Sequence, residues 1–97
     1  MNHNLHFYWE VVKMKAPISK VTAREDGVLL VSFDSGNSVA LDMKPRFNAY
    51  RFGVLSNPSI FATADTDGNF VRWYKDTLVV AELGFREIIK MLLGEAY

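Results

Sequence analysis

Cysteine is absent from this chain of 97 residues, and its absence excludes several kinds of chemistry. Without cysteine the chain has no disulfide bond, no thiolate nucleophile and no cysteine-based zinc site. Chains without disulfides are typical of reducing compartments, so we expect a cytoplasmic protein.

The chain also lacks an excess of charge of either sign and any long apolar run. Its 11 basic and 11 acidic residues cancel, so no overall positive field attracts nucleic acid or anionic membranes. Apolar runs such as residues 28–31 are far shorter than the roughly 20 residues that span a bilayer. The first residues show no secretory signal pattern. We therefore expect no membrane partner.

Histidine and glycine are too sparse for the common catalytic motifs. Both histidines, His3 and His6, lie at the start of the chain, where we expect a flexible terminus over residues 1–6. The 6 glycines are scattered singly, which excludes phosphate-binding and dinucleotide-binding loops. Residues 65–69 resemble the start of a calcium-binding loop, but Phe70 stands where that loop needs glycine. We expect no catalytic residue, no metal and no cofactor, and hence no enzyme.

What is present is the composition of an ordered domain, with 49% hydrophobic and 23% charged residues. We expect a single domain over residues 1–97. The clearest local signal is a hairpin over residues 28–43, whose two arms alternate apolar and polar residues. The sequence Asp34-Ser35-Gly36-Asn37 between the arms favours a tight turn, because these residues accept positive φ or cap their own backbone.

Further segments with period two predict more strands. Asp67-Gly68 is a second hairpin turn, flanked by apolar and aromatic residues. The aromatic first strand is apolar on both faces, which is typical of a central strand or of one that holds a partner. Besides the hairpin arms, the predicted strands are residues 7–14, 19–25, 62–66, 70–74 and 77–80.

Two short helices and one longer helix complete the prediction. Pro45 favours a short helix that ends at Gly53, and Asn57 followed by Pro58 favours a second one, with the asparagine as its N-cap. Residues 81–93 carry the apolar spacing of an amphipathic helix, with Gly94 as its stop. The apolar stripe of that helix is Phe85, Ile88, Ile89 and Leu92. We predict an α+β fold: a mostly antiparallel sheet of five to seven short strands, two short connecting helices and a C-terminal amphipathic helix.

Aromatic and basic residues supply the candidate interaction surface. Tryptophan, tyrosine and arginine are favoured in protein interfaces, and the same residue types interleaved on a sheet bind single-stranded nucleic acid. One group lies in the first predicted strand and the other in the middle third of the chain. The candidate residues are Phe7, Tyr8, Trp9, Arg46, Tyr50, Arg51, Arg72, Trp73 and Tyr74.

The order of these segments resembles a small bacterial family known as domain of unknown function 2442. The resemblance covers residues 21–83 and is carried by the sequence LLVSFDSGNSVALDMKP, by Phe52-Gly53-Val54-Leu55 with Asn57-Pro58 and Phe61, and by DTDGNFVRW. After Trp73 the chain departs from the family, which often has asparagine or aspartate with glycine there. The resemblance implies a compact α+β domain, often encoded beside another small protein in an arrangement like a toxin–antitoxin pair. It carries no catalytic residue.

These observations favour a non-catalytic protein-interaction or regulatory module. We expect an unidentified protein partner, encoded nearby as in the toxin–antitoxin-like arrangement, and self-association into a homodimer through the first predicted strand. The alternative is a nucleic-acid-binding regulator that uses the arginine and aromatic residues, against which the zero net charge argues. A further alternative is an enzyme of unknown type.

Overall fold

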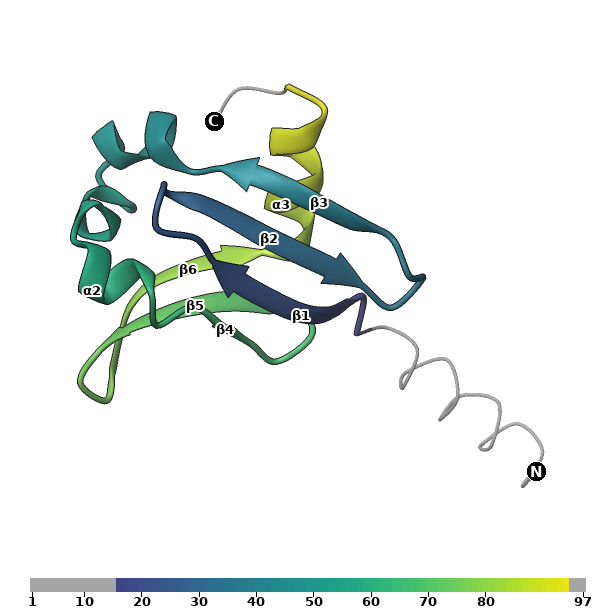
Figure 1. Cartoon of the computed structure of the whole chain (residues 1–97), viewed down its shortest axis with the longest axis horizontal. Helices are drawn as coiled ribbons and strands as arrows, with labels where there is room; N and C mark the ends of the chain where they lie inside the picture. Colours follow the sequence, from purple (N-terminus) through teal and green to yellow (C-terminus); the bar gives the residue numbers. More distant parts are fainter. Residues whose placement is uncertain (1–15, 95–97) are drawn as a thin grey trace.

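Six β-strands form two antiparallel sheets in the part of the chain that the computed structural model describes, residues 16–94 (Figure 1). The first sheet has the order β1-β2-β3 and the second the order β4-β5-β6. The fold class is therefore α+β, as predicted, but the strands do not form one sheet. The strands are β1 (Ile18–Ala23), β2 (Val28–Phe33), β3 (Ser38–Asp42), β4 (Asp65–Thr66), β5 (Phe70–Lys75) and β6 (Leu78–Gly84).

The predicted hairpin of residues 28–43 is confirmed as β2 and β3. The two strands pair in continuous register from Val28 opposite Asp42 to Ser32 opposite Ser38. Leu29 and Val31 are fully buried, because every second side chain of β2 faces the core. Gly36 occupies the turn with a φ of +96°, a conformation that favours glycine.

The second predicted hairpin, at Asp67-Gly68, is also confirmed, and it joins β4 to β5. The carboxylate of Asp67 accepts hydrogen bonds from the backbone N–H groups of Asn69 and Phe70, which closes the turn. The next strand is longer than the predicted residues 77–80: β6 pairs with β5 as far as Gly84 opposite Phe70.

The first sheet and the second meet where β1 begins. The N–H of Ile18 donates to the carbonyl of Gly68 in the β4–β5 turn at 2.9 Å. On the side of the first sheet, the N–H of Asp34 just after β2 donates to the carbonyl of Pro17 at 2.8 Å. Strand β1 begins one residue earlier than the predicted segment 19–25 and ends at Ala23. The predicted strand at residues 7–14 lies outside the described residues.

Three short helical segments gather at one end of the strands (Figure 1). They are η1 (Lys44–Asn48), η2 (Gly53–Ser56) and α2 (Pro58–Phe61). Only α2 is α-helical, with Asn57 as the predicted N-cap accepting from the N–H of Ser59 at 2.9 Å. The expected helix after Pro45 is instead a 3₁₀ turn, because the chain turns back at once towards η2 and lacks the length for α-helical bonding.

The C-terminal helix α3 (Phe85–Leu92) starts four residues later than predicted. Residues 81–84 belong to β6, where Ala81 and Leu83 alternate into the core. The predicted stripe is also shifted: Ile88 and Met91 are the buried residues of α3, whereas Leu92 is 40% exposed. Over residues 81–84 the burial pattern of a strand and that of a helix are the same, so the sequence pattern does not distinguish them. Pairing with β5 places these residues in the strand.

One cluster of buried side chains fills the space between the two sheets and the helical segments. Trp73 of β5 is its largest fully buried member and stacks on Phe61 of α2, with ring centroids 6.1 Å apart. Phe61 also makes an edge contact with Phe47 of η1. Within residues 16–94, no helix is long and apolar enough to cross a membrane.

Candidate interaction surface

The structure separates the predicted arginine and aromatic residues into core and surface. Trp73 is fully buried, so it is not available to a partner on the surface of this fold. Tyr74 is half-buried on the opposite face of β5, and Tyr50 is fully exposed. Arg46 is half-buried in η1. The remaining aromatic candidates, Phe7, Tyr8 and Trp9, lie outside the described residues.

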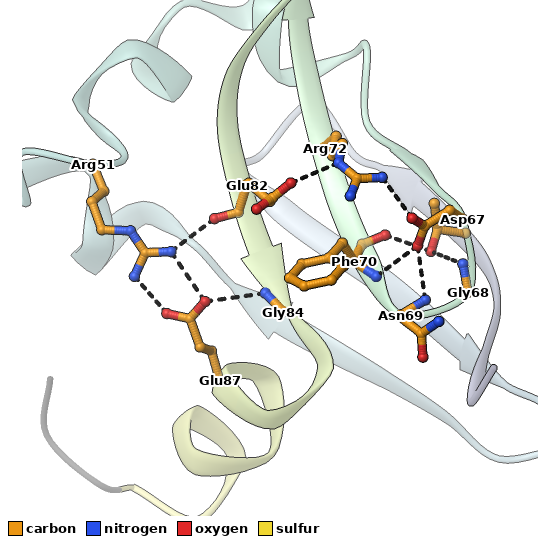
Figure 2. Close-up of polar contacts among 10 residues, drawn as sticks. Arg51, Asp67, Gly68, Asn69, Phe70, Arg72, Glu82, Gly84 and Glu87 are labelled. Carbon is orange, nitrogen blue, oxygen red and sulfur yellow. Dashed lines mark hydrogen bonds and ion pairs between the residues drawn. The ribbon is translucent and has the colours of Figure 1, made fainter. Parts of the chain in front are cut away.

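Arg51 is held against the start of α3 by a two-pronged ion pair. Its guanidinium donates to both carboxylate oxygens of Glu87, with Nη2 and Oε1 3.0 Å apart, and to the carbonyl of Glu82 at 2.9 Å (Figure 2). Glu87 Oε1 also accepts from the N–H of Gly84 at 3.1 Å, which caps the helix. The hydrogen bonds from Arg51 lower the pKa of the Glu87 carboxyl. Arg51 thus ties the η1–η2 loop to the helix start.

Arg72 of β5 forms two ion pairs within the second sheet, one with Glu82 of β6 and one with Asp67 of the β4–β5 turn. Its Nε lies 2.6 Å from a carboxylate oxygen of Glu82, and its Nη1 lies 2.7 Å from Oδ2 of Asp67 (Figure 2). Its guanidinium also lies over the ring of Phe70, 5.1 Å from the centroid. Glu82 therefore touches both arginines, through its carbonyl and through its side chain.

The charge of this face argues against a nucleic-acid site. The two guanidinium groups face the three carboxylates of Asp67, Glu82 and Glu87, so the ion-paired network itself carries one net negative charge. Binding to a phosphate backbone depends on uncompensated cations. Arg51 and Arg72 both contact Glu82, but both guanidinium groups are ion-paired with carboxylates.

Asp67 should make the stability of the protein depend on pH. The hydrogen bond from Arg72, followed by those from the N–H groups of Asn69 and Phe70, lowers the pKa of Asp67 from 3.8 to about 2. Because the folded value lies below the unfolded one, the stabilisation is complete above pH 3.8 and is lost as the pH falls towards 2. The Asp67 side chain is 47% exposed, so solvent screening limits the effect to about 1 kcal/mol at pH 7.

We expect Asp67→Asn to lower the free energy of unfolding at pH 7 and to approach the wild type as the pH falls towards 2, as measured by urea unfolding. Asparagine keeps a side-chain oxygen that can accept the hydrogen bonds from Asn69 and Phe70. The difference in free energy of unfolding between the two proteins therefore reports the contribution of the negative charge. Asp34→Asn is the matched control, because Asp34 is an exposed turn residue without an ion pair among residues 16–94. A difference between Asp67→Asn and wild type that stays constant down to pH 2 would contradict this assignment.

Two adjoining hollows beside this network form an apolar groove, which we call the Phe85 groove. One has a volume of about 440 Å³ and the other about 760 Å³, and they share Pro17 and Phe85. The rings of Phe33 and Phe85 meet edge to face on its floor, with centroids 5.9 Å apart. Phe70 is 37% exposed beside it. The lining residues are Pro17, Phe33, Asp34, Ser35, Asn69, Phe70, Gly84, Phe85, Arg86, Glu87 and Ile89.

Backbone hydrogen bonds fix the walls of the Phe85 groove. The carbonyl of Pro17 accepts from Asp34 at the end of β2, and the carbonyl of Asn69 accepts from the N–H of Phe85 at 2.9 Å. Parts of four segments distant in the sequence are thereby held around one depression. A surface held in this way would require little reordering on contact with another molecule.

The sequence alone does not reveal the Phe85 groove. Its alternation predicts a strand position for Phe33, and its helical spacing predicts that Phe85 and Ile89 are buried, but all three side chains are only partly buried. One sequence signal does point to the groove: α3 contains more apolar residues than one buried helix face needs, and Phe85, Ile89 and Leu92 are not fully buried. Only the late start of α3 at Phe85 places this residue at the junction of the two sheets.

The described residues offer no metal site: within residues 16–94, no group of three histidine, cysteine, aspartate or glutamate side chains is placed to hold an ion. His3 and His6 lie outside this range. Comparison with protein-family models, curated proteins and solved structures gave no match. The Phe85 groove is thus identified by its own geometry.

Proposed function

We propose that this protein is a non-catalytic protein-interaction module and that the Phe85 groove is its binding surface. The observation that carries the proposal is the partly exposed apolar floor of the groove, formed by Phe33, Phe70, Phe85 and Ile89 beside Glu87, which is ion-paired with Arg51. An apolar centre with a polar rim is the usual anatomy of a protein interface. The volume of the two hollows suits several apolar side chains of a partner.

The partner we propose is a small protein encoded by a neighbouring gene, in an arrangement like a toxin–antitoxin pair. This part of the proposal rests on the resemblance to domain of unknown function 2442. On the same resemblance we propose that the chain belongs to that family. The module would act by occupying or presenting a surface of its partner. We place both proteins in the cytoplasm, in keeping with the absence of cysteine.

Co-expression with the neighbouring gene product tests the proposal. We expect the tagged chain to retain that product, and Ile89→Asp to weaken the purified complex about tenfold or more in calorimetry, because it places a charge on the apolar floor. Leu93→Asp is the matched control at the C-cap of the same helix, since Leu93 is 70% exposed and lies outside the groove.

Ser35→Arg provides a second test, because Ser35 is an exposed turn residue on the groove rim and its replacement leaves the core intact. We expect it to weaken the complex as well. Unchanged affinity of both groove variants, or no binding of the neighbouring product by the wild type, would contradict the proposal.

A further inference from the structure

We propose that residues 5–14 of the same chain occupy the Phe85 groove when no partner is bound, so that a partner must displace them. This inference rests on the proposed function of the groove and adds the regulation of that site. It commits to an intramolecular occupant: the segment of this chain that enters the described structure at the groove.

The first argument is position. The described chain begins at Ala16, and its second residue, Pro17, lines both hollows of the groove. Only Lys15 and Ala16 separate Met14 from Pro17 in the sequence, and a tether of this length reaches at most roughly 10 Å. So short a tether gives the segment an effective concentration in the millimolar range at the groove.

The second argument is composition. Seven of the ten residues from 5 to 14 are apolar or aromatic, and the other three are histidine, glutamate and lysine. Such a segment loses free energy by burying these side chains against apolar surface, and the nearest such surface is the floor formed by Phe33, Phe85 and Ile89. If the segment occupies the groove, the apolar side chains of both are buried together. If it does not, both apolar surfaces remain exposed to water as a large patch.

The third argument is the way in which the entry point is anchored. Ile18 N–H donates to Gly68 on one side of Pro17, and the Pro17 carbonyl accepts from Asp34 on the other. The direction in which the chain leaves the two sheets is therefore fixed at the groove. A ligand tethered at a fixed point retains the entropic advantage of its linkage.

Spin labelling of the full chain tests this inference without truncation. The chain has no cysteine, so Asn37→Cys carries a single nitroxide in the exposed β2–β3 turn, outside the lining of the groove. We expect this label to broaden the amide signals of residues 5–14 in nuclear magnetic resonance spectra of the monomer. Thr77→Cys is the control, since Thr77 lies at the opposite end of the β5–β6 hairpin, roughly 20 Å from Phe70 along β5.

Tryptophan emission gives an independent readout, because Trp9 belongs to the segment and the difference from Trp9→Phe isolates its signal. We expect blue-shifted emission and weak acrylamide quenching, and a several-fold rise in quenching in Ile89→Asp but not in Leu93→Asp. Equal quenching in Ile89→Asp and wild type would overturn the inference. So would the absence of broadening from position 37.

Mixing the nitroxide-labelled chain with an unlabelled, isotope-enriched copy separates the intramolecular occupant from a second copy. Broadening that appears only in such mixtures and grows with concentration would show that another molecule supplies the segment, and it would overturn the intramolecular form. If the segment is absent from the groove while the neighbouring gene product still binds there in an Ile89-dependent manner, the inference fails and the proposed function stands.

Discussion

Replacement of Trp73 by alanine is expected to destabilise the protein by about 3–5 kcal/mol. Trp73 is the largest fully buried side chain of the described residues, and it lies where β5 packs on α2. Its removal leaves a cavity between elements that backbone pairing holds in place, so the site cannot collapse around the smaller side chain. Stabilities of 5–15 kcal/mol are usual for a domain, so this one change consumes a large part of the total.

Trp73→Phe serves as the companion variant. Within residues 16–94, the indole Nε1 of Trp73 is buried without a hydrogen-bond partner, and burial of an unsatisfied donor costs about 1–3 kcal/mol. Phenylalanine keeps an aromatic ring against Phe61 and removes that donor, so we expect a much smaller loss than for alanine. Urea unfolding followed by circular dichroism measures both variants. A loss below about 1 kcal/mol for Trp73→Ala would contradict the central position of this side chain.

Gly68→Ala is expected to cost more than glycine-to-alanine replacement at any ordinary turn. Gly68 has a φ of +103°, and an added Cβ would lie 2.7 Å from the Cβ of Ala16. The unfavourable backbone conformation costs about 1–2 kcal/mol, and the overlap adds about 1–3 kcal/mol. Ala16 has no side-chain torsion with which to move away, so the backbone must shift, and the hydrogen bond from Ile18 N–H to Gly68 opposes that shift.

Gly36→Ala is the matched control for this prediction. Gly36 has a similar φ of +96°, but nothing lies within 4 Å of the position of an added Cβ. Both variants carry the conformational cost, and only Gly68→Ala carries the overlap. We therefore expect Gly68→Ala to have the lower free energy of unfolding and the lower melting temperature in calorimetry. Equal losses for the two variants would show that β1 does not pack on the β4–β5 turn in this way.

The local elements of the fold were largely predictable from the sequence. The arms of the β2–β3 hairpin alternate with period two, and the turn residues between them accept the required backbone angles. Asn57 followed by Pro58 carries its own capping chemistry, and Asp67-Gly68 its own turn chemistry. These signals are contained in a few neighbouring residues, so no knowledge of the rest of the chain is needed to read them.

The boundary of α3 was predicted wrongly for the opposite reason. Residues 81–84 fit both the helical spacing and the alternation of a strand, and local preference does not separate the two. Pairing of Leu83 with Val71 and of Gly84 with Phe70 decided in favour of β6. The strand moved the start of the helix to Phe85, and it thereby placed this ring at the edge of the groove.

The candidate site shows the same division. Residue type identified Arg51 and Arg72 as candidates, but their carboxylate partners come from segments 5–36 positions away along the chain. The same reasoning offered Trp73 as a surface residue, although β5 directs it into the core. Residue type states what a side chain is able to contact. Its exposure depends on the elements that cover it.

The sequence by itself determined the absence of thiol chemistry, the alternating strands, their turns and the cap of α2, because each depends on composition or on residues a few positions apart. Only the tertiary structure decided that the strands form two sheets, that Trp73 is buried, that both arginines are paired, and that Pro17, Phe33, Phe70 and Phe85 meet around one groove. These features depend on contacts between segments far apart in the chain, where burial and hydrogen bonding override the preferences of single residues.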